Sequence, residues 1–235
     1  MQWKITLPAV LILLVVLGLE CGAHVPYLEH QDYTEEAPFV VRRSIEQSIA
    51  VYAWLENDGI HACEDIDVYR FEISEPTRVY IEGIVPVCRQ YEEFVPWFAL
   101  AGPGLPQPQQ EVPFDIPEGY GAVVVENVAP GEERETFYEP FGGKSYYKSP
   151  VFDRVMNQSG TYYVYYWDPY ERGGDYVAVL GRQEIFRFWD IVRALIYTPM
   201  IRLDMELHVD CEPPFMALRA CRALWFDPNP FESWG

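Results

Sequence analysis

Basic residues are scarce in this sequence. Lysine and arginine together number 17 against 36 aspartates and glutamates, which gives a formal net charge of −19 at pH 7 over 235 residues. A nucleic-acid-binding surface must be basic to replace the counterions of the phosphates. An anionic membrane surface likewise attracts basic segments. The overall charge therefore argues against both kinds of partner, and we expect no binding of nucleic acid.

Long apolar runs are also missing, except at the start of the chain. Residues 7–19 are almost wholly apolar; Lys4 precedes them, and the small residues Cys21, Gly22 and Ala23 follow. This order is typical of a secretory signal peptide, and a run of about 13 residues is short for a membrane span, which needs roughly 20. We expect residues 1–23 to be a signal peptide cut after Ala23, with an uncleaved anchor as the alternative. The remaining chain would then be secreted or lie in the cell envelope, without a transmembrane span.

Cysteines are few, and none has the CxxC spacing of a zinc site. After removal of the predicted signal peptide, four cysteines remain: Cys63, Cys88, Cys211 and Cys221. In an exported chain such cysteines are expected to form disulfides. We expect Cys63–Cys88, which flanks two consecutive predicted strands, and Cys211–Cys221, which closes a short loop. Four free, buried thiols are the alternative.

The sequence is rich in aromatic and other apolar residues, which make up 16% and 49% of the chain. Residues 67–73 alternate between two sets of side chains, with Tyr69, Phe71 and Ile73 on one face, and this period of two predicts a half-buried strand. By similar arguments we predict strands at 49–55, 67–73, 78–85, 94–100, 120–125, 161–167 and 176–180. Glycine- and proline-rich turns separate them. The fold class is therefore mostly β: an antiparallel β-sandwich or jelly roll over residues 45–182, after an extended N-terminal lead-in over 24–44.

A helical period replaces the strand pattern after residue 183. Between Glu184 and Tyr197 the apolar residues fall on one helical face. They are Ile185, Phe188, Trp189, Val192, Leu195 and Ile196. We expect one C-terminal α-helix, ended by Pro199 and packed on the sandwich, within a segment of residues 183–210. A helix lying in a membrane interface is the alternative, because Trp and Phe cluster in it. Residues 211–235 are expected to form an irregular tail.

Two stretches resemble a known family. Residues 65–71 (DIDVYRF) resemble the D-x-D-x-Y-x-F strand of bacterial pre-peptidase C-terminal domains, and residues 160–165 (GTYYVY) with 174–177 (GDYV) resemble their closing hairpin. The resemblance covers about a tenth of the chain. It implies a secreted, non-catalytic β-sandwich that binds a partner or aids secretion, and some members carry calcium. This sequence departs from the family pattern: it has no protease domain, a longer stretch between the motifs, and a helix and tail after them.

The first candidate site is an acidic turn. It comprises Asn57, Asp58, Glu64, Asp65 and Asp67. Calcium prefers six to eight oxygen ligands, which carboxylates and carbonyls supply, so this turn is a candidate calcium site, although it lacks the spacing of an EF-hand. The alternative is a solvated turn in which Asp65 or Asp67 caps backbone amides.

The second candidate site is the predicted new N-terminus. After cleavage, the amine and imidazole of His24 could chelate one copper ion, and a second imidazole from His30, His61 or His208 would complete the site. An ordinary exposed terminus is the alternative.

The third candidate site is a cluster of tyrosines in the strand at 161–167. Because side chains alternate along a strand, Tyr163, Tyr165 and Trp167 share one face, opposite Tyr162 and Tyr166. One of the two faces must belong to the core. The face with Tyr163, Tyr165 and Trp167 is a candidate platform for a sugar or a protein, unless the C-terminal helix covers it.

Catalysis has little support in the sequence. No nucleophile-elbow or triad signature is present, and Glu139, Glu171 and Glu184 have no spacing that requires a glycosidase-like carboxylate pair. We therefore expect an exported, non-catalytic module that binds a protein or carbohydrate partner. The alternative is a metal-binding protein, with calcium favoured over copper, and a hydrolase ranks third.

Overall fold

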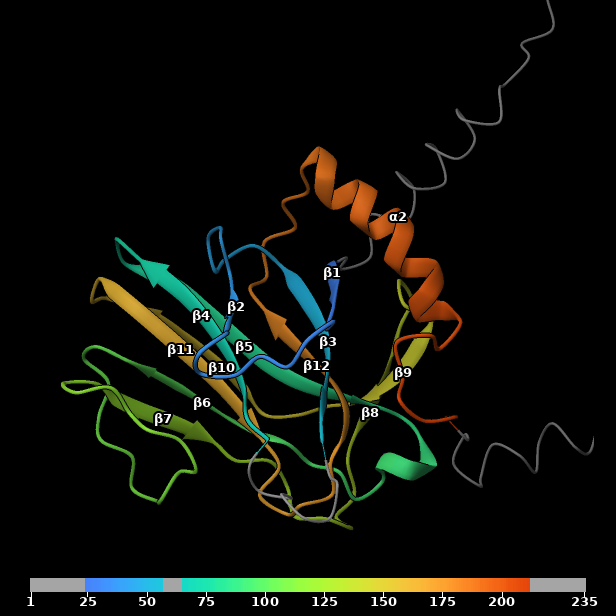
Figure 1. Cartoon of the computed structure of the whole chain (residues 1–235), viewed down its shortest axis with the longest axis horizontal. Helices are drawn as coiled ribbons and strands as arrows, with labels where there is room; N and C mark the ends of the chain where they lie inside the picture. Colours follow the sequence, from blue (N-terminus) through green and yellow to red (C-terminus); the bar gives the residue numbers. More distant parts are fainter. Residues whose placement is uncertain (1–23, 57–64, 212–235) are drawn as a thin grey trace, which may run out of the picture.

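The structure is a computed structural model that describes residues 24–56 and 65–211 (Figure 1). Several of the predictions above concern residues outside these ranges. They are the signal peptide, the tail beyond Cys211, and Asn57, Asp58, His61, Cys63, Glu64 and Cys221.

The described chain forms two β-sheets packed face to face (Figure 1). The first sheet has the order β1-β3-β12-β5-β9-β8, with β10 also paired to β5. These strands are β1 (Val25–Leu28), β3 (Ile49–Leu55), β12 (Gly174–Leu180), β5 (Thr77–Pro86), β9 (Lys144–Tyr147), β8 (Thr136–Glu139) and β10 (Val151–Met156). The second sheet has the order β2-β4-β11-β6-β7. Its strands are β2 (Phe39–Val40), β4 (Asp67–Ile73), β11 (Gly160–Trp167), β6 (Trp97–Gly102) and β7 (Gly121–Val125).

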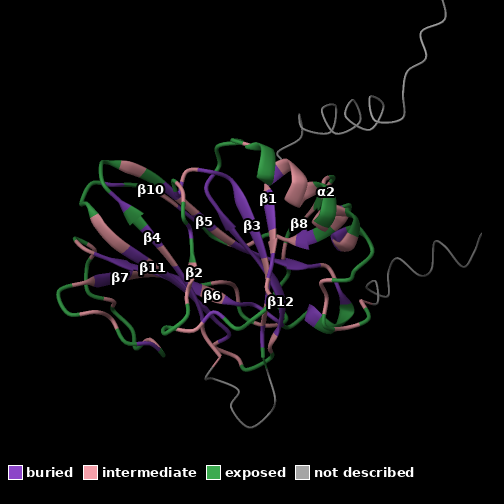
Figure 2. Ribbon diagram, turned by 45° about the horizontal axis from the view of Figure 1, so that its top comes forward, coloured by how far each residue is buried: buried purple, intermediate pink, exposed green. Residues whose placement is uncertain are grey.

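The main core lies between the sheets, where the strands are buried (Figure 2). Every second side chain of β4 and β11 points into this core, for example Phe71 and Tyr162. These side chains pack against every second side chain of the first sheet, for example Ile81 and Tyr176. The rings of Phe71 and Tyr162 stack with centroids 5.6 Å apart. Burial of large aromatic and aliphatic side chains is the main favourable contribution to folding. The predicted fold class, mostly β with one helix, is confirmed.

Residues 24–44 contribute two short strands rather than only a lead-in. Strand β1 pairs parallel with β3 of the first sheet, and β2 pairs parallel with β4 of the second. Between them Tyr33 is buried in the main core. This segment therefore crosses from one sheet to the other at their shared edge.

The single α-helix of the described residues, α2, spans Phe188–Arg202, not 184–197. It begins later because the Asp190 carboxylate accepts a hydrogen bond from the backbone N–H of Arg187, which fixes Arg187 as the N-cap. Pro199 does not end the helix but lies in its last turn. A proline at this position removes one intrahelical hydrogen bond, yet the helix continues to Arg202. No helix among the described residues is long and apolar enough to cross a membrane.

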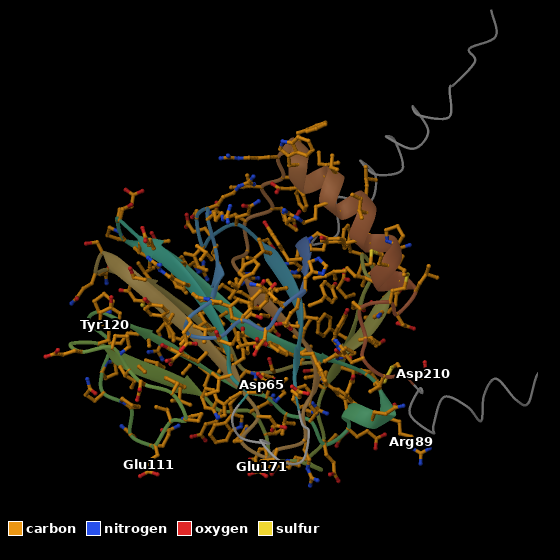
Figure 3. All side chains as sticks on the ribbon, viewed as in Figure 1. Asp65, Arg89, Glu111, Tyr120, Glu171 and Asp210 are labelled. Carbon is orange, nitrogen blue, oxygen red and sulfur yellow. A yellow bond between two sulfur atoms is a disulfide. The ribbon has the colours of Figure 1, made fainter. Side chains whose placement is uncertain are left out.

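The disulfide of the described residues joins Cys88 to Cys211, so both predicted pairings are wrong. The prediction relied on closeness in sequence, whereas these cysteines are separated by 123 residues. The chain after α2 returns to the end of β5: Gln90 Nε2 donates to the Asp210 carbonyl at 2.5 Å, beside the short 3₁₀ helix η1 (Arg89–Tyr91). Arg89 and Asp210 lie near each other in Figure 3. Tertiary structure thus brings together two cysteines that the sequence separates.

Candidate functional site

Three carboxylates lie close together at the start of β4. They belong to Glu29, Asp32 and Asp67, and one oxygen from each lies within 4.8 Å of the other two. Oxygens bound to one calcium ion lie about 2.3–2.6 Å from it, and therefore within about 5.2 Å of one another, a limit that the three oxygens meet. We call these three residues the acidic cluster.

Backbone pairing brings the acidic cluster together. Glu29 follows β1, and its N–H donates to the Tyr52 carbonyl at 2.9 Å, which extends the β1–β3 pairing by one residue. Asp67 opens β4, and the N–H of the next residue, Val68, donates to the Tyr33 carbonyl at 2.5 Å. Asp32 lies between these two attachment points. The two parallel pairings therefore fix the spacing of the carboxylates.

Two oxygens of the acidic cluster are buried without a hydrogen-bond donor. Asp67 is fully buried; its Oδ2 accepts from the Tyr176 hydroxyl at 2.6 Å, while Oδ1 has no partner. Glu29 Oε2 accepts from the Trp54 N–H at 2.9 Å, while Oε1 has no donor group; when one of the two carboxyl groups is protonated, Glu29 and Asp67 hydrogen-bond to each other. A buried carboxylate oxygen without a donor is costly, unless a proton or a cation neutralises it.

The pKa values of these carboxyl groups agree with their burial and their lack of hydrogen-bond donors. Burial is the main cause that raises the pKa of Glu29 to about 7 and the pKa of Asp67 well above its ordinary value. The charges of Asp32 and Asp65 raise both further. Burial also raises the pKa of Asp65 to about 6. Burial thus favours the protonated form of each group, and a nearby positive charge would favour the ionised form.

The acidic cluster adjoins an open, acidic cleft of about 570 Å³. Asp32 of the cluster lines this cleft, together with Asp65 (labelled in Figure 3), Glu35, Glu36 and Asp115. No lysine or arginine of the described residues lines it. Glu29 and Asp67 do not line the cleft, so Asp32 is the residue of the acidic cluster that faces it.

The predicted calcium turn coincides only in part with this site. Asp67 belongs to the acidic cluster, and Asp65 lies beside it, while its Oδ2 accepts a hydrogen bond from the Glu56 N–H. Asp65 thus also caps a backbone amide, as the alternative proposed. Glu29 and Asp32 were not predicted, because no spacing pattern in the sequence links the N-terminal segment to Asp67. The other predicted ligands lie outside the described residues.

A second concave site covers the outer face of the first sheet. This cavity has a volume of about 270 Å³ and an apolar floor that includes Ile84 and Val179. Aromatic side chains, carboxylates, one arginine and one histidine line it: Tyr52, Tyr80, Phe137, Phe141, Tyr146, Glu82, Glu139, Glu184, Arg182 and His24. We call it the tyrosine cavity.

His24 lies at this cavity, where its Nδ1 is 2.5 Å from the Ser48 hydroxyl and burial lowers its pKa to about 4. The imidazoles proposed to complete a copper site are engaged elsewhere. His30 contacts the Tyr197 hydroxyl at 3.3 Å, and His208 contacts Asp175 at 2.6 Å. The third imidazole lies outside the described residues. The described histidines therefore do not converge on His24.

Two of the three candidate catalytic glutamates meet at the tyrosine cavity. Glu139 and Glu184 both line it, whereas Glu171 lies in the β11–β12 turn, at the lower edge of Figure 3. Both carboxylate oxygens of Glu139 accept backbone N–H groups, those of Phe141 and Gly142, at 2.7 and 2.5 Å. The structure thus gives Glu139 a clear role in shaping the turn after β8.

The predicted aromatic platform on β11 is wrong for two of its three members. Tyr165 and Trp167 are buried, and Tyr163 is partly buried. The loop between β6 and β7 covers them: Phe114 stacks on Tyr165 with ring centroids 3.9 Å apart and lies 5.6 Å from the Trp167 ring. The alternative, that the C-terminal helix covers this face, is wrong for the same reason. Phe114, Tyr165 and Trp167 belong to a second, smaller hydrophobic core.

Comparison with known proteins gives limited information. No family model matches the sequence. No curated protein matches it either. Among solved structures, the chain is similar to the pre-peptidase C-terminal domain of collagenase from Bacillus anthracis, with 13% sequence identity and a TM-score of 0.30. The match covers 61% of this chain and 94% of that domain.

Proposed function

We propose that this chain is an exported, non-catalytic β-sandwich module that binds one calcium ion at Glu29, Asp32 and Asp67. The observation that carries the proposal is the unpartnered Oδ1 of the fully buried Asp67, within 4.8 Å of oxygens from two other carboxylates. Without a cation, Asp67 and Glu29 would have to hold protons to remain buried. A divalent cation supplies the missing positive charge.

The donor set favours calcium over other metals. The acidic cluster offers only carboxylate oxygens, whereas zinc and copper sites rely on imidazole or thiolate ligands. Magnesium requires a near-ideal octahedron, while calcium accepts irregular sets of six to eight oxygens. Water in the acidic cleft would complete the coordination. The role of the ion is structural, because it would link the segment after β1 to the start of β4.

Thermal unfolding of the purified protein in calcium and in a chelator tests the proposal. At a calcium concentration of about 100 times the Kd, binding stabilises the folded state by roughly 2.7 kcal/mol, which raises the Tm by about 5–10 °C. Asp67→Asn should abolish this increase. Glu111→Gln, which removes an exposed acid outside the acidic cluster, should retain it. Calorimetry that detects no heat of calcium binding, together with an unchanged Tm, would refute the proposal.

A second candidate function is the binding of a carbohydrate in the tyrosine cavity. The observation that favours it is the combination of ring faces with carboxylates: the Tyr80 hydroxyl donates to Glu82 at 2.7 Å within a cavity that Tyr52 and Phe137 also line. Aromatic rings pack against the C–H face of a sugar, and carboxylates accept its hydroxyl hydrogens. Such a partner would lie at the cell surface or outside the cell.

A glycan array read with the fluorescently labelled protein tests this second function. Tyr80→Ala should remove binding, whereas Val155→Ser, at an exposed position of β10, should not change it. Absence of binding across the array would reject a carbohydrate partner. A protein partner would then be the remaining interpretation of the binding module.

A further inference from the structure

The apolar stripe of α2 faces solvent. Phe188 and Trp189 are each 70% exposed, and Leu195 and Ile196 are 46% and 55% exposed. Ile185 before the helix and Leu203 and Met205 after it are also exposed. The stripe contains five of the six residues that were expected to face the sandwich. We call it the α2 apolar face.

The opposite face of α2 holds this orientation. Asp190 is buried and pairs with Arg43 at 2.5 Å, and its Oδ2 lies 3.3 Å from Gln47 Nε2. At the other end of the helix Ile201 is fully buried, and Arg202 donates to the Phe141 carbonyl at 3.0 Å. Rotation of the helix to place its apolar face on the sandwich would break these contacts at both ends. An exposed apolar patch of this kind marks a site of interaction.

The charged residues within α2 and its N-cap are mostly basic, whereas the exposed acids Glu184 and Asp204 flank the helix at its two ends. Between Ile185 and Leu203 the only acid is Asp190, which is buried and paired. The other charged residues there are Arg187, Arg193 and Arg202. The accessible charge of the helix is therefore basic, on a chain whose net charge is −19. Most of the acidic residues lie elsewhere.

The start of the described chain lies on the same side of the molecule. Strand β1 packs against α2 (Figure 1), and Arg193 stacks over the Tyr27 ring at 4.1 Å. The apolar residues 7–19 join the described chain at His24, directly before β1. In the alternative in which the signal peptide is not cleaved, the longest apolar run of the sequence precedes β1, the strand that packs against α2.

We propose that the α2 apolar face docks into the interface of a phospholipid bilayer, with Phe188 and Trp189 inserted among the acyl chains. Interfacial helices carry Trp, Phe and Leu on the buried face and arginine or lysine beside it, as α2 does. The helix lies in the membrane plane and does not cross it. The acidic remainder of the protein points toward water, away from negatively charged lipids.

Fluorescence of Trp189 with lipid vesicles tests the proposal. The full chain and Trp189→Phe are mixed, in chelator, with phosphatidylcholine vesicles that contain a minor fraction of phosphatidylglycerol, and the two spectra are subtracted. The difference spectrum reports Trp189. It should shift to the blue with vesicles, and brominated phosphatidylcholine should quench it. An unchanged difference spectrum overturns the proposal, even if the protein sediments with vesicles through its N-terminal segment.

A paired substitution measures the contribution of the face. Phe188→Ser with Trp189→Ser should weaken vesicle partitioning by at least about tenfold, because two large apolar side chains no longer insert. Val155→Ser, which alters an exposed apolar residue on β10, should leave partitioning unchanged. If the paired substitution instead dissociates a dimer in lipid-free solution, and Trp189 is not quenched, the face binds a second copy and the proposal is wrong.

Discussion

The acidic cluster and the α2 apolar face break the usual rule of burial in opposite ways. In the acidic cluster, carboxylate oxygens of Asp67 and Glu29 lie buried without donors. On α2, Phe188 and Trp189 lie in water at 70% exposure. Each arrangement is unfavourable for the isolated chain.

The difference between the regions indicates what each one lacks. The acidic cluster lacks positive charge, which a small cation supplies without any change of fold. The α2 apolar face lacks an apolar environment, which only a large partner or a bilayer can offer. We propose that the first is a site for an ion that stabilises the fold, and the second a site for attachment of the folded protein.

Removal of the disulfide should have the largest effect. In the chain-entropy account, a bond across 123 residues stabilises the folded state by about 4–5 kcal/mol. Cys88→Ala with Cys211→Ala should therefore reduce the free energy of unfolding in urea by this amount. The calcium-induced stabilisation should persist, because neither cysteine contacts the acidic cluster. A reduction below about 1 kcal/mol would contradict the prediction.

The pH dependence of metal-free stability should have the next largest effect. The folded-state pKa of Glu29 is about 7, above an ordinary value of 4.5, so the folded state holds a proton that the unfolded state releases. Stability is then greatest below pH 4.5 and decreases as the pH rises to about 7, by roughly 3 kcal/mol. Urea titrations in chelator across this range measure the decrease. Calcium should suppress it, and Glu29→Gln should flatten it.

Loss of the Asp190 contacts that hold α2 should lower the stability moderately, and only around the helix. Asp190→Asn leaves Arg43 without its charged partner and weakens the N-terminal hydrogen bond of α2. We expect a cost of about 2 kcal/mol. Hydrogen exchange should accelerate in α2 and remain unchanged in β4. Equal acceleration in both elements would show that the helix and the sandwich unfold as one unit.

Charge placed on the α2 apolar face should have the smallest effect on stability. Leu195→Lys and Ile196→Lys alter exposed side chains, so the free energy of unfolding should change by no more than about 0.5 kcal/mol. Chemical denaturation measures this. A cost of several kcal/mol would show that these side chains are buried in solution, against a second copy for example.

The strands were predictable because their side chains alternate. The β4 pattern of Tyr69, Phe71 and Ile73 places these residues in the core, as expected. The face of α2 was not predictable in the same way. Its period identifies a helix with one apolar side, but not whether that side meets the protein or a partner. The orientation is set by Asp190 and Ile201, two residues outside the stripe.

Long-range pairing explains what the sequence did not reveal. Asp65 and Asp67 stand in one acidic turn and were identified, whereas Glu29 and Asp32 reach the same place only through the parallel pairing of β1 with β3. Phe114 lies in a loop rich in proline and glycine, and nothing nearby indicates that it stacks on Tyr165. The partner of Cys88 was missed for the same reason.

The bond between Cys88 and Cys211 places the chain from β6 to the end of α2 inside a single covalent ring. A protease that cuts once within this ring leaves both pieces joined. The cut molecule would keep its mass on a gel until a reductant separates the pieces. Exposed loops such as that around Glu111 (Figure 3) are thus protected from the main consequence of a nick, which is the loss of a fragment.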